Sequence, residues 1–121
     1  MTIITADDEP LALEMLTDLV KTVKPEAEVF SFSRPQKIVE WIKTNKADVA
    51  FLDIRMRGMT GLELAEAIKA KAPETNIIFV TGYDEYALPA MSLHASGYVM
   101  KPVSEEKIRK DKKWIIIATA K

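Results

Sequence analysis

The feature of this sequence that most constrains its fold is a repeated alternation between short apolar runs and amphipathic segments. The apolar or alternating runs predict strands, at residues 3–6, 28–32, 49–52, 77–80 and 97–100. Between them, apolar residues recur at helical spacing, which predicts helices within 11–23, 38–42, 62–68 and 86–94 and from about 104 onward. Continuous apolar strands that alternate with helices are typical of a parallel sheet covered on both faces. We therefore expect an α/β protein with a flavodoxin-like (βα)5 three-layer sandwich and the strand order 2-1-3-4-5.

The size and charge of the chain narrow the classes of protein further. Its 121 residues, 48% of them apolar, suit one compact domain, so we expect a single domain over residues 1–121. The net charge of −1, from 17 basic and 18 acidic residues, argues against direct nucleic-acid or membrane binding by this chain. No apolar run approaches the ~20 residues of a membrane span. The chain has no cysteine, which excludes a thiol nucleophile and a cysteine metal site, and we expect a cytoplasmic protein.

Polar side chains follow four of the predicted strands, at the point where each strand ends. Asp7 and Asp8 follow the first strand, Asp53 the third, Thr81 the fourth and Lys101 the fifth. In open sheets of this kind, ligands bind outside the carboxyl ends of the strands, where the strand order reverses. We therefore expect three carboxylates, one hydroxyl and one amine to gather at one edge of the sheet.

The chemistry of this set indicates phosphoryl transfer. Three carboxylates close together repel one another, and Mg²⁺, which prefers oxygen ligands, relieves that repulsion. Lys101 supplies a point positive charge for a phosphoryl oxygen, and Thr81 can donate a hydrogen bond to another such oxygen. Such a site is suited to transfer of a phosphoryl group onto a carboxylate, which gives an aspartyl phosphate.

Several motifs of this chain resemble one known family. The stretches are DDEP at residues 7–10, FLDIRMRGMTGLEL at 51–64, IIFVTGYDEYAL at 77–88 and LHASGYVMKPV at 93–103. In this order and at this spacing they resemble the receiver domain of bacterial two-component response regulators, over roughly residues 2–108. The YDEYAL and LHASGYVMKPV stretches are most similar to the receivers of LytTR-type transcriptional regulators.

The resemblance implies a role for each residue of the predicted site. Asp53 would accept the phosphoryl group from a sensor histidine kinase and would hold Mg²⁺ together with Asp8. Asp7 would hold a water bound to the metal, and the backbone carbonyl of Arg55 would be the third protein ligand.

The same resemblance implies the residues of a conformational switch. Thr81 would be the switch hydroxyl, Tyr98 the switch aromatic residue, and Lys101 the lysine that contacts the phosphoryl group. The peptide bond between Lys101 and Pro102 would be cis. The domain would then shift between inactive and active conformations. It would catalyse only its own phosphorylation and dephosphorylation, so we do not expect an enzyme in the usual sense.

The chain departs from the family pattern in several places, two of which bear on the site and on the end of the domain. Arg57 stands where the family usually has proline, so we expect the loop after Asp53 to lose a backbone restraint and to be more mobile. The last helix is atypical, because polar residues follow Ile108 and four apolar residues then stand together at 114–117. We expect no DNA-binding output domain in this chain. We leave open whether the chain forms a homodimer, through that tail or through the fourth helix and fifth strand.

Plainer interpretations exist for these residues. Acidic residues favour helix N-termini, aspartates are common in turns, and Tyr98 could pack on the sheet of any protein. Two other functions remain open. One is an interaction module that keeps the fold but works without phosphorylation. The other is a hydrolase with an aspartyl-phosphate intermediate, which would need a second aspartate two residues after the nucleophile, where this chain has Arg55.

Overall fold

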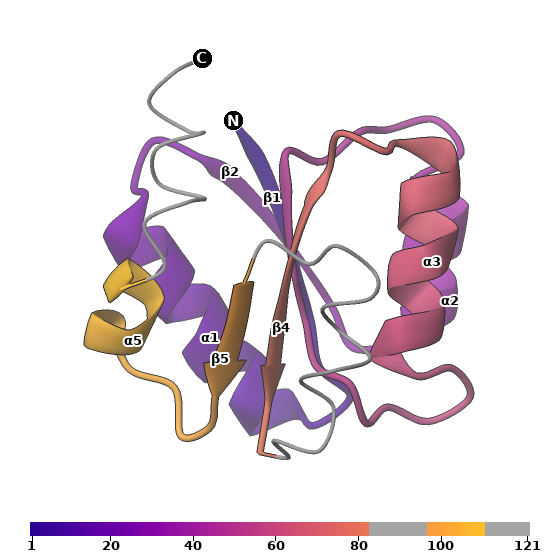
Figure 1. The fold of residues 1–121 in the computed structure, drawn as a ribbon. Helices are drawn as coiled ribbons and strands as arrows, with labels where there is room; N and C mark the ends of the chain where they lie inside the picture. Colours follow the sequence, from indigo (N-terminus) through magenta and orange to yellow (C-terminus); the bar gives the residue numbers. More distant parts are fainter. Residues whose placement is uncertain (83–96, 111–121) are drawn as a thin grey trace.

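The computed structural model describes residues 1–82 and 97–110, which form a parallel sheet flanked by helices (Figure 1). The sheet has five strands in the order β2-β1-β3-β4-β5. The strands are β1 (Thr2–Ala6), β2 (Glu28–Phe32), β3 (Val49–Leu52), β4 (Asn76–Thr81) and β5 (Gly97–Met100). The helices are α1 (Pro10–Val23), α2 (Pro35–Trp41), α3 (Gly61–Lys71) and α5 (Glu105–Lys110).

The helices cover both faces of the sheet and divide the core into two layers. Helices α1 and α5 lie on one face, and α2 and α3 lie on the other (Figure 1). Leu16 and Val20 of α1 pack with Phe51 and Ile78 in one buried cluster, which Ile108 of α5 completes. The other cluster joins residues of α2 and α3 to the opposite face of the strands, including Ile38, Leu64, Ile68, Leu52 and Phe79. The inner strands are buried on both faces, which is why their sequences are continuous apolar runs.

Local signals fix the starts of the helices. α1 begins with Pro10 in its first turn, where the missing N–H leaves no hydrogen bond unmade. A capping box starts α3: the Thr60 hydroxyl accepts a hydrogen bond from the Glu63 N–H (3.1 Å), and the Glu63 carboxylate accepts one from the Thr60 N–H (2.9 Å). The Ser104 hydroxyl accepts from the Lys107 N–H at 3.2 Å and so caps α5.

The structure confirms the predicted fold class and strand order. The helix at the third position begins at Gly61, one residue before the predicted start, because the Thr60 cap sets its first turn. The Lys101–Pro102 peptide bond is cis, as expected. The predicted fourth helix and the apolar run at 114–117 lie outside the described residues, so the expectations for them stay predictions.

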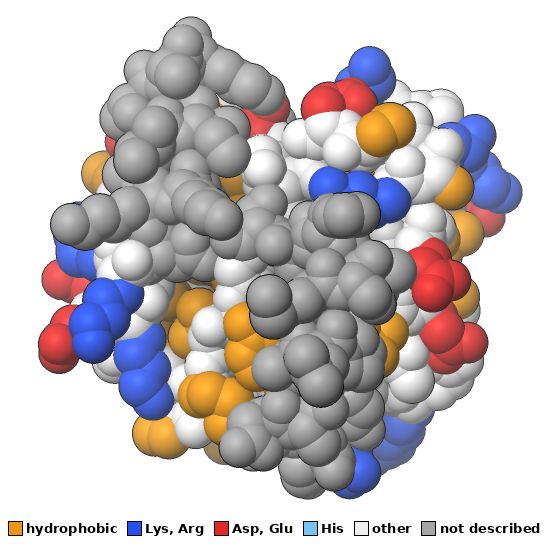
Figure 2. Space-filling model, in the orientation of Figure 1, with side chains coloured by type: hydrophobic (Ala, Val, Ile, Leu, Met, Phe, Trp, Pro, Cys, Tyr) orange, Lys and Arg blue, Asp and Glu red, His pale blue; other side chains and the backbone are white. Residues whose placement is uncertain are grey.

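The surface carries charges of both signs, in keeping with the net charge of −1. Basic and acidic side chains alternate over the described part of the face shown in Figure 2, and α5 carries both kinds. Among the described residues, no helix is long and apolar enough to cross a membrane.

Candidate functional site

The pairing of β1 with β3 brings the carboxyl ends of these two strands to the same edge of the sheet. Ala6 of β1 pairs with Leu52 of β3, so the residues that follow each strand lie side by side. The Asp53 N–H donates to the Ala6 carbonyl at 2.9 Å, and the Asp7 N–H donates to the Phe32 carbonyl at 3.2 Å. These bonds hold both aspartates at the carboxyl edge, next to the point where the strand order reverses.

Three aspartates meet at this edge. Asp7, Asp8 and Asp53 each offer a carboxylate oxygen, and these oxygens all lie within 4.8 Å of one another. Asp7 and Asp53 are 2% and 6% exposed, whereas the side chain of Asp8 is 25% exposed and faces the opening. The convergence predicted from the sequence is therefore present, with two carboxylates buried and the third at the surface.

Lys101 places its ammonium group against the buried pair. Its Nζ lies 2.9 Å from an Asp7 oxygen and 3.4 Å from an Asp53 oxygen. The Lys101 N–H donates to the Thr81 carbonyl at 2.8 Å, which ties the end of β5 to the end of β4. Lys101 thus neutralises part of the negative charge, and in this state its shorter contact is to Asp7 and not to Asp53.

The surroundings change the proton affinity of two of these groups. Burial, and secondly the charge of Asp7, raise the pKa of Asp53 from 3.8 to about 6, although Lys101 acts in the opposite direction. Burial by itself would lower the pKa of Lys101, but the hydrogen bond to Asp7 and the attraction of both carboxylates raise it above its ordinary value. The protein therefore holds the Asp53 carboxylate in an environment that disfavours its charge.

Replacing Asp53 by asparagine is expected to stabilise the metal-free protein at neutral pH. The raised pKa means that the folded protein binds the Asp53 proton more tightly than the unfolded chain does. The unfavourable contribution of Asp53 is therefore absent below pH 3.8, grows as the pH rises to about 6, and is fully present above that. We expect Asp53→Asn to gain about 1 to 3 kcal/mol of unfolding free energy above this range, and the gain to shrink as the pH approaches 4.

Urea unfolding in EDTA at several pH values measures this gain. The exposed substitution Asp18→Asn is the matched control, and we expect it to change stability by less than about 0.5 kcal/mol. A less stable Asp53→Asn protein at pH 7.5, or a gain that does not depend on pH, would contradict the assigned environment of Asp53.

The donor set at this edge suits Mg²⁺. The ion prefers oxygen ligands and keeps several waters, so that one or two carboxylates with a carbonyl are enough to hold it. Asp7, Asp8 and Asp53 each offer a carboxylate oxygen, and Arg55 lies two residues beyond Asp53 in the following loop. The role of the Arg55 carbonyl and the division of roles among the aspartates stay predictions.

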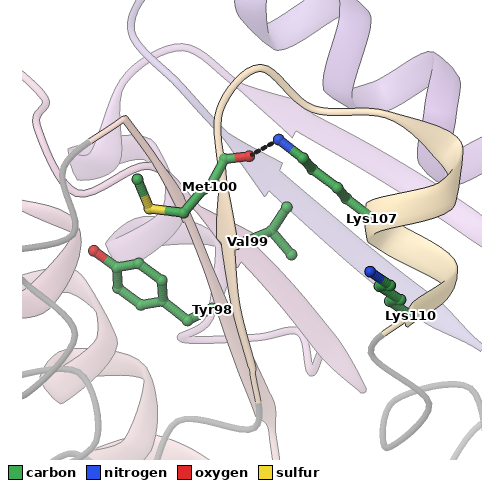
Figure 3. A pocket seen from close by; sticks show the side chains of 5 residues that line it. All are labelled: Tyr98, Val99, Met100, Lys107 and Lys110. Atoms are coloured by element: carbon green, nitrogen blue, oxygen red, sulfur yellow. Dashed lines mark hydrogen bonds between the residues drawn. The ribbon is translucent and has the colours of Figure 1, made fainter.

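The two predicted switch residues lie on β4 and β5, the strands that follow β3 in the sheet order. Thr81 ends β4 and is completely buried. Tyr98 pairs with Phe79 across the β4–β5 ladder, and its half-buried ring packs against the core layer formed with α2 and α3. Figure 3 shows Tyr98 and Met100 on one side of β5 and Val99 on the other, next to α5. The positions fit the predicted switch, and the roles of both residues stay predictions.

Two contacts around the site do not follow from the sequence. The Arg57 N–H donates to an Asp8 carboxylate oxygen at 2.9 Å, a bond that spans 49 residues of sequence and depends on the path of the loop. Gly61 packs against the Asp53 backbone so closely that a side chain there would overlap the Asp53 carbonyl oxygen. The Met-Thr-Gly stretch at the start of α3 signals such a glycine, but the sequence does not say what approaches it.

A parallel sheet with aspartates and a lysine at its carboxyl edge fits the phosphoryl-transfer site predicted from the sequence. Residues 3–112 match the response regulator receiver domain family. The sensory transduction protein LytT of Enterococcus faecalis is 36% identical over 108 residues, which cover 89% of this chain and 45% of that protein. The positive alginate biosynthesis regulatory protein of Pseudomonas aeruginosa is 37% identical over 112 residues, covering 88% of this chain and 43% of that protein.

Solved structures agree with the sequence comparison. The response regulator protein TrrA from Thermotoga maritima, in complex with Mg²⁺ and BeF, superposes with a TM-score of 0.75 at 29% identity, covering 91% of this chain and 97% of that one. A CheY-like receiver domain protein from Methanospirillum hungatei JF-1 gives a TM-score of 0.84 at 23% identity, covering 99% and 98% of the two chains. This second likeness concerns the fold alone.

This chain belongs to the response regulator receiver domain family, the phosphorylated switch domains of two-component systems. Its relatives include regulators of the LytT and LytR type, which confirms the resemblance read from the sequence. The chain spans less than half the length of the curated relatives given above.

Proposed function

We propose that Asp53 is the acceptor of a phosphoryl group presented by a sensor histidine kinase. A carboxylate oxygen of Asp53 attacks the phosphorus of a phosphohistidine, so that a P–O bond forms, the P–N bond breaks and the imidazole leaves. Mg²⁺ at Asp8 and Asp53, when bound, supplies positive charge for the transferred oxygens. The observation that carries this proposal is the position of Asp53 at the strand end, between a second carboxylate and the Lys101 ammonium.

The phosphorylated state is proposed to rearrange the contacts of Lys101 and Thr81. The new phosphoryl oxygens compete with Asp7 for the Lys101 ammonium, which now contacts both Asp7 and Asp53. Thr81, in moving toward the phosphoryl group, would leave space for Tyr98 to turn inward. The result is a population shift between two conformations, driven by a change of charge at one site. The domain turns over no outside metabolite, so its catalysis is limited to its own aspartyl phosphate.

The surface of α1 supports docking of the kinase beside the acceptor. Leu11 and Met15 are large apolar side chains that are 74% and 55% exposed. Met15 also lines an apolar cavity of about 100 Å³ with Val103, and Asp7 and Lys101 reach the same cavity. Exposed apolar side chains next to a reactive group are typical of a protein interaction site. We therefore propose that the kinase binds at this surface of α1. Because ATP phosphorylates the histidine of the kinase, we also propose that the protein works in the cytoplasm.

The relatives support two further parts of the proposal. Because they include transcriptional regulators, we propose that the switch controls transcription, directly or through a partner. Because Tyr98 lies on β5, a change in its position would alter the surface of this edge strand. We therefore propose a homodimer through the fourth helix and fifth strand, or through the C-terminal tail, in the phosphorylated state.

Intact-mass measurement after incubation with acetyl phosphate tests this function. With MgCl2 we expect the wild-type protein to gain one phosphoryl group, and we expect no gain in EDTA or in the Asp53→Ala variant. Asp18→Asn, which alters an exposed carboxyl group away from the site, is expected to behave like the wild type. A folded wild-type protein that takes up no phosphoryl group would favour an interaction module that works without phosphorylation.

A further inference from the structure

The loop that follows Asp53 is tied to Asp8 at the opening of the site. The Arg57 N–H donates to Oδ2 of Asp8 at 2.9 Å. The Arg57 guanidinium lies farther away, with its Nε 4.0 Å from the same oxygen, and the side chain is 98% exposed. The backbone hydrogen bond is therefore the ordered contact, and the exposed ion pair contributes little.

The next residue fixes the loop from its other side. Gly58 has a φ of +85°, a conformation that favours glycine, and the Gln36 side chain covers the place where a Cβ would stand. Gln36 belongs to the first turn of α2. The loop is thus held between α2 and Asp8, and a groove of about 570 Å³ separates these anchors. The structure shows anchors at the position where the sequence predicted a loss of restraint.

We propose that Arg57 is a positioning residue for Mg²⁺, acting through its backbone N–H on Asp8. The hydrogen bond fixes the rotation of the Asp8 carboxylate beside Asp7 and Asp53, and partners that orient metal ligands in this way contribute 10- to 100-fold to metal affinity in other proteins. Proline, the residue that the family usually has here, lacks the N–H and cannot form this bond. The inference rests on the proposed function, because it assigns Asp8 to the metal.

The Arg57 guanidinium lowers the affinity for Mg²⁺, whereas the Arg57 N–H raises it. A positive charge near Asp8 repels a divalent cation, but full exposure to water and salt keeps this repulsion small. Arg57→Ala removes the guanidinium and keeps the N–H. Arg57→Pro removes both and adds the φ restraint of the proline ring, so these two variants differ in the hydrogen bond and in that restraint.

Titration with MgCl2, followed by the amide signals of the labelled protein in NMR, measures the affinity of each variant. We expect Arg57→Ala to bind Mg²⁺ within about threefold of the wild type, and Arg57→Pro to bind about tenfold more weakly than Arg57→Ala. Lys46→Ala removes the same charge from the opposite end of β3, where Lys46 is exposed, and is expected to leave the affinity unchanged.

The outcomes separate this inference from the proposed function. A wild-type protein that binds no Mg²⁺ would contradict the proposed function itself. Equal affinities for Arg57→Pro and Arg57→Ala, or tighter binding by Arg57→Pro, would overturn only the role of Arg57. If Arg57→Pro does not fold, the wild-type amide signal decides: we expect the Arg57 N–H to be shifted downfield, and to lose that shift in Asp8→Ala, which removes the acceptor. An Arg57 amide that is unshifted in the wild type would overturn the inference.

Discussion

Replacing Gly61 by alanine is expected to destabilise this domain by about 2 to 3 kcal/mol, because no space exists for the added methyl group. The new Cβ would overlap the Asp53 carbonyl oxygen and would lie 2.9 Å from both the Asp53 carbonyl carbon and the Ile54 Cα. The obstacles are backbone atoms, which cannot move aside as a flexible side chain can. The Gly61 N–H also donates to the Ile54 carbonyl at 2.7 Å, so a shift of α3 would break that bond.

Thermal or urea unfolding measures this effect, and the chain offers a matched control. Gly82 lies beyond the end of β4, and a Cβ there would meet no atom within 4 Å among the residues that the structure describes, its chain neighbours aside. We expect Gly82→Ala to unfold within about 0.5 kcal/mol of the wild type. Since Asp53 would be displaced in Gly61→Ala, this variant is also expected to take up phosphoryl groups more slowly. If the two alanine variants were equally stable, Gly61 would not lie as close to the Asp53 backbone as described.

Replacing Lys101 by alanine is expected to destabilise the metal-free protein by about 2 to 3 kcal/mol at pH 7.5. Lys101 contacts Asp7 at 2.9 Å and Asp53 at 3.4 Å, and its removal would leave two buried carboxylates without their cation. The value lies below the roughly 3 to 5 kcal/mol expected for a fully buried ion pair, because the Lys101 side chain is 28% exposed.

Two conditions are expected to restore stability to the Lys101→Ala protein. Mg²⁺ supplies positive charge at the same carboxylates, and acid protonates Asp53, whose pKa is already raised by burial. Urea unfolding with and without MgCl2, at pH 7.5 and pH 5, measures both. Lys37→Ala removes a lysine from the exposed side of α2 and should show neither the loss nor the recovery. A Lys101→Ala protein as stable in EDTA as Lys37→Ala would contradict the charge balance described for this site.

The arrangement of the site could be predicted from the sequence because it follows from topology. Once the strands at 3–6 and 49–52 are recognised as parallel neighbours, the aspartates that follow them must lie at one edge. The continuous apolar runs made those strands easy to recognise, and β2, β3 and β5 have the predicted bounds. The capping box of Thr60 and Glu63 also has a sequence signature, since it consists of threonine and glutamate three residues apart.

Other features depend on the path of the chain in space. The Arg57 N–H that donates to Asp8 belongs to the backbone, so the residue type at position 57 does not predict this hydrogen bond. The absence of proline at that position predicted only a more mobile loop. The preference of Lys101 for Asp7 over Asp53 depends on differences of half an ångström in contact distance. The raised pKa of Asp53 depends first on its burial, which is a property of the packed site.

The most direct test of the account is to locate the phosphoryl group. After phosphorylation by acetyl phosphate and Mg²⁺, borohydride reduction converts an aspartyl phosphate to homoserine, which peptide mass spectrometry assigns to one residue. The account predicts homoserine at Asp53, and at neither Asp7 nor Asp8, although the three carboxylates lie together. Homoserine at Asp7 or Asp8, or label distributed over all three residues, would contradict the assignment of Asp53 as the acceptor.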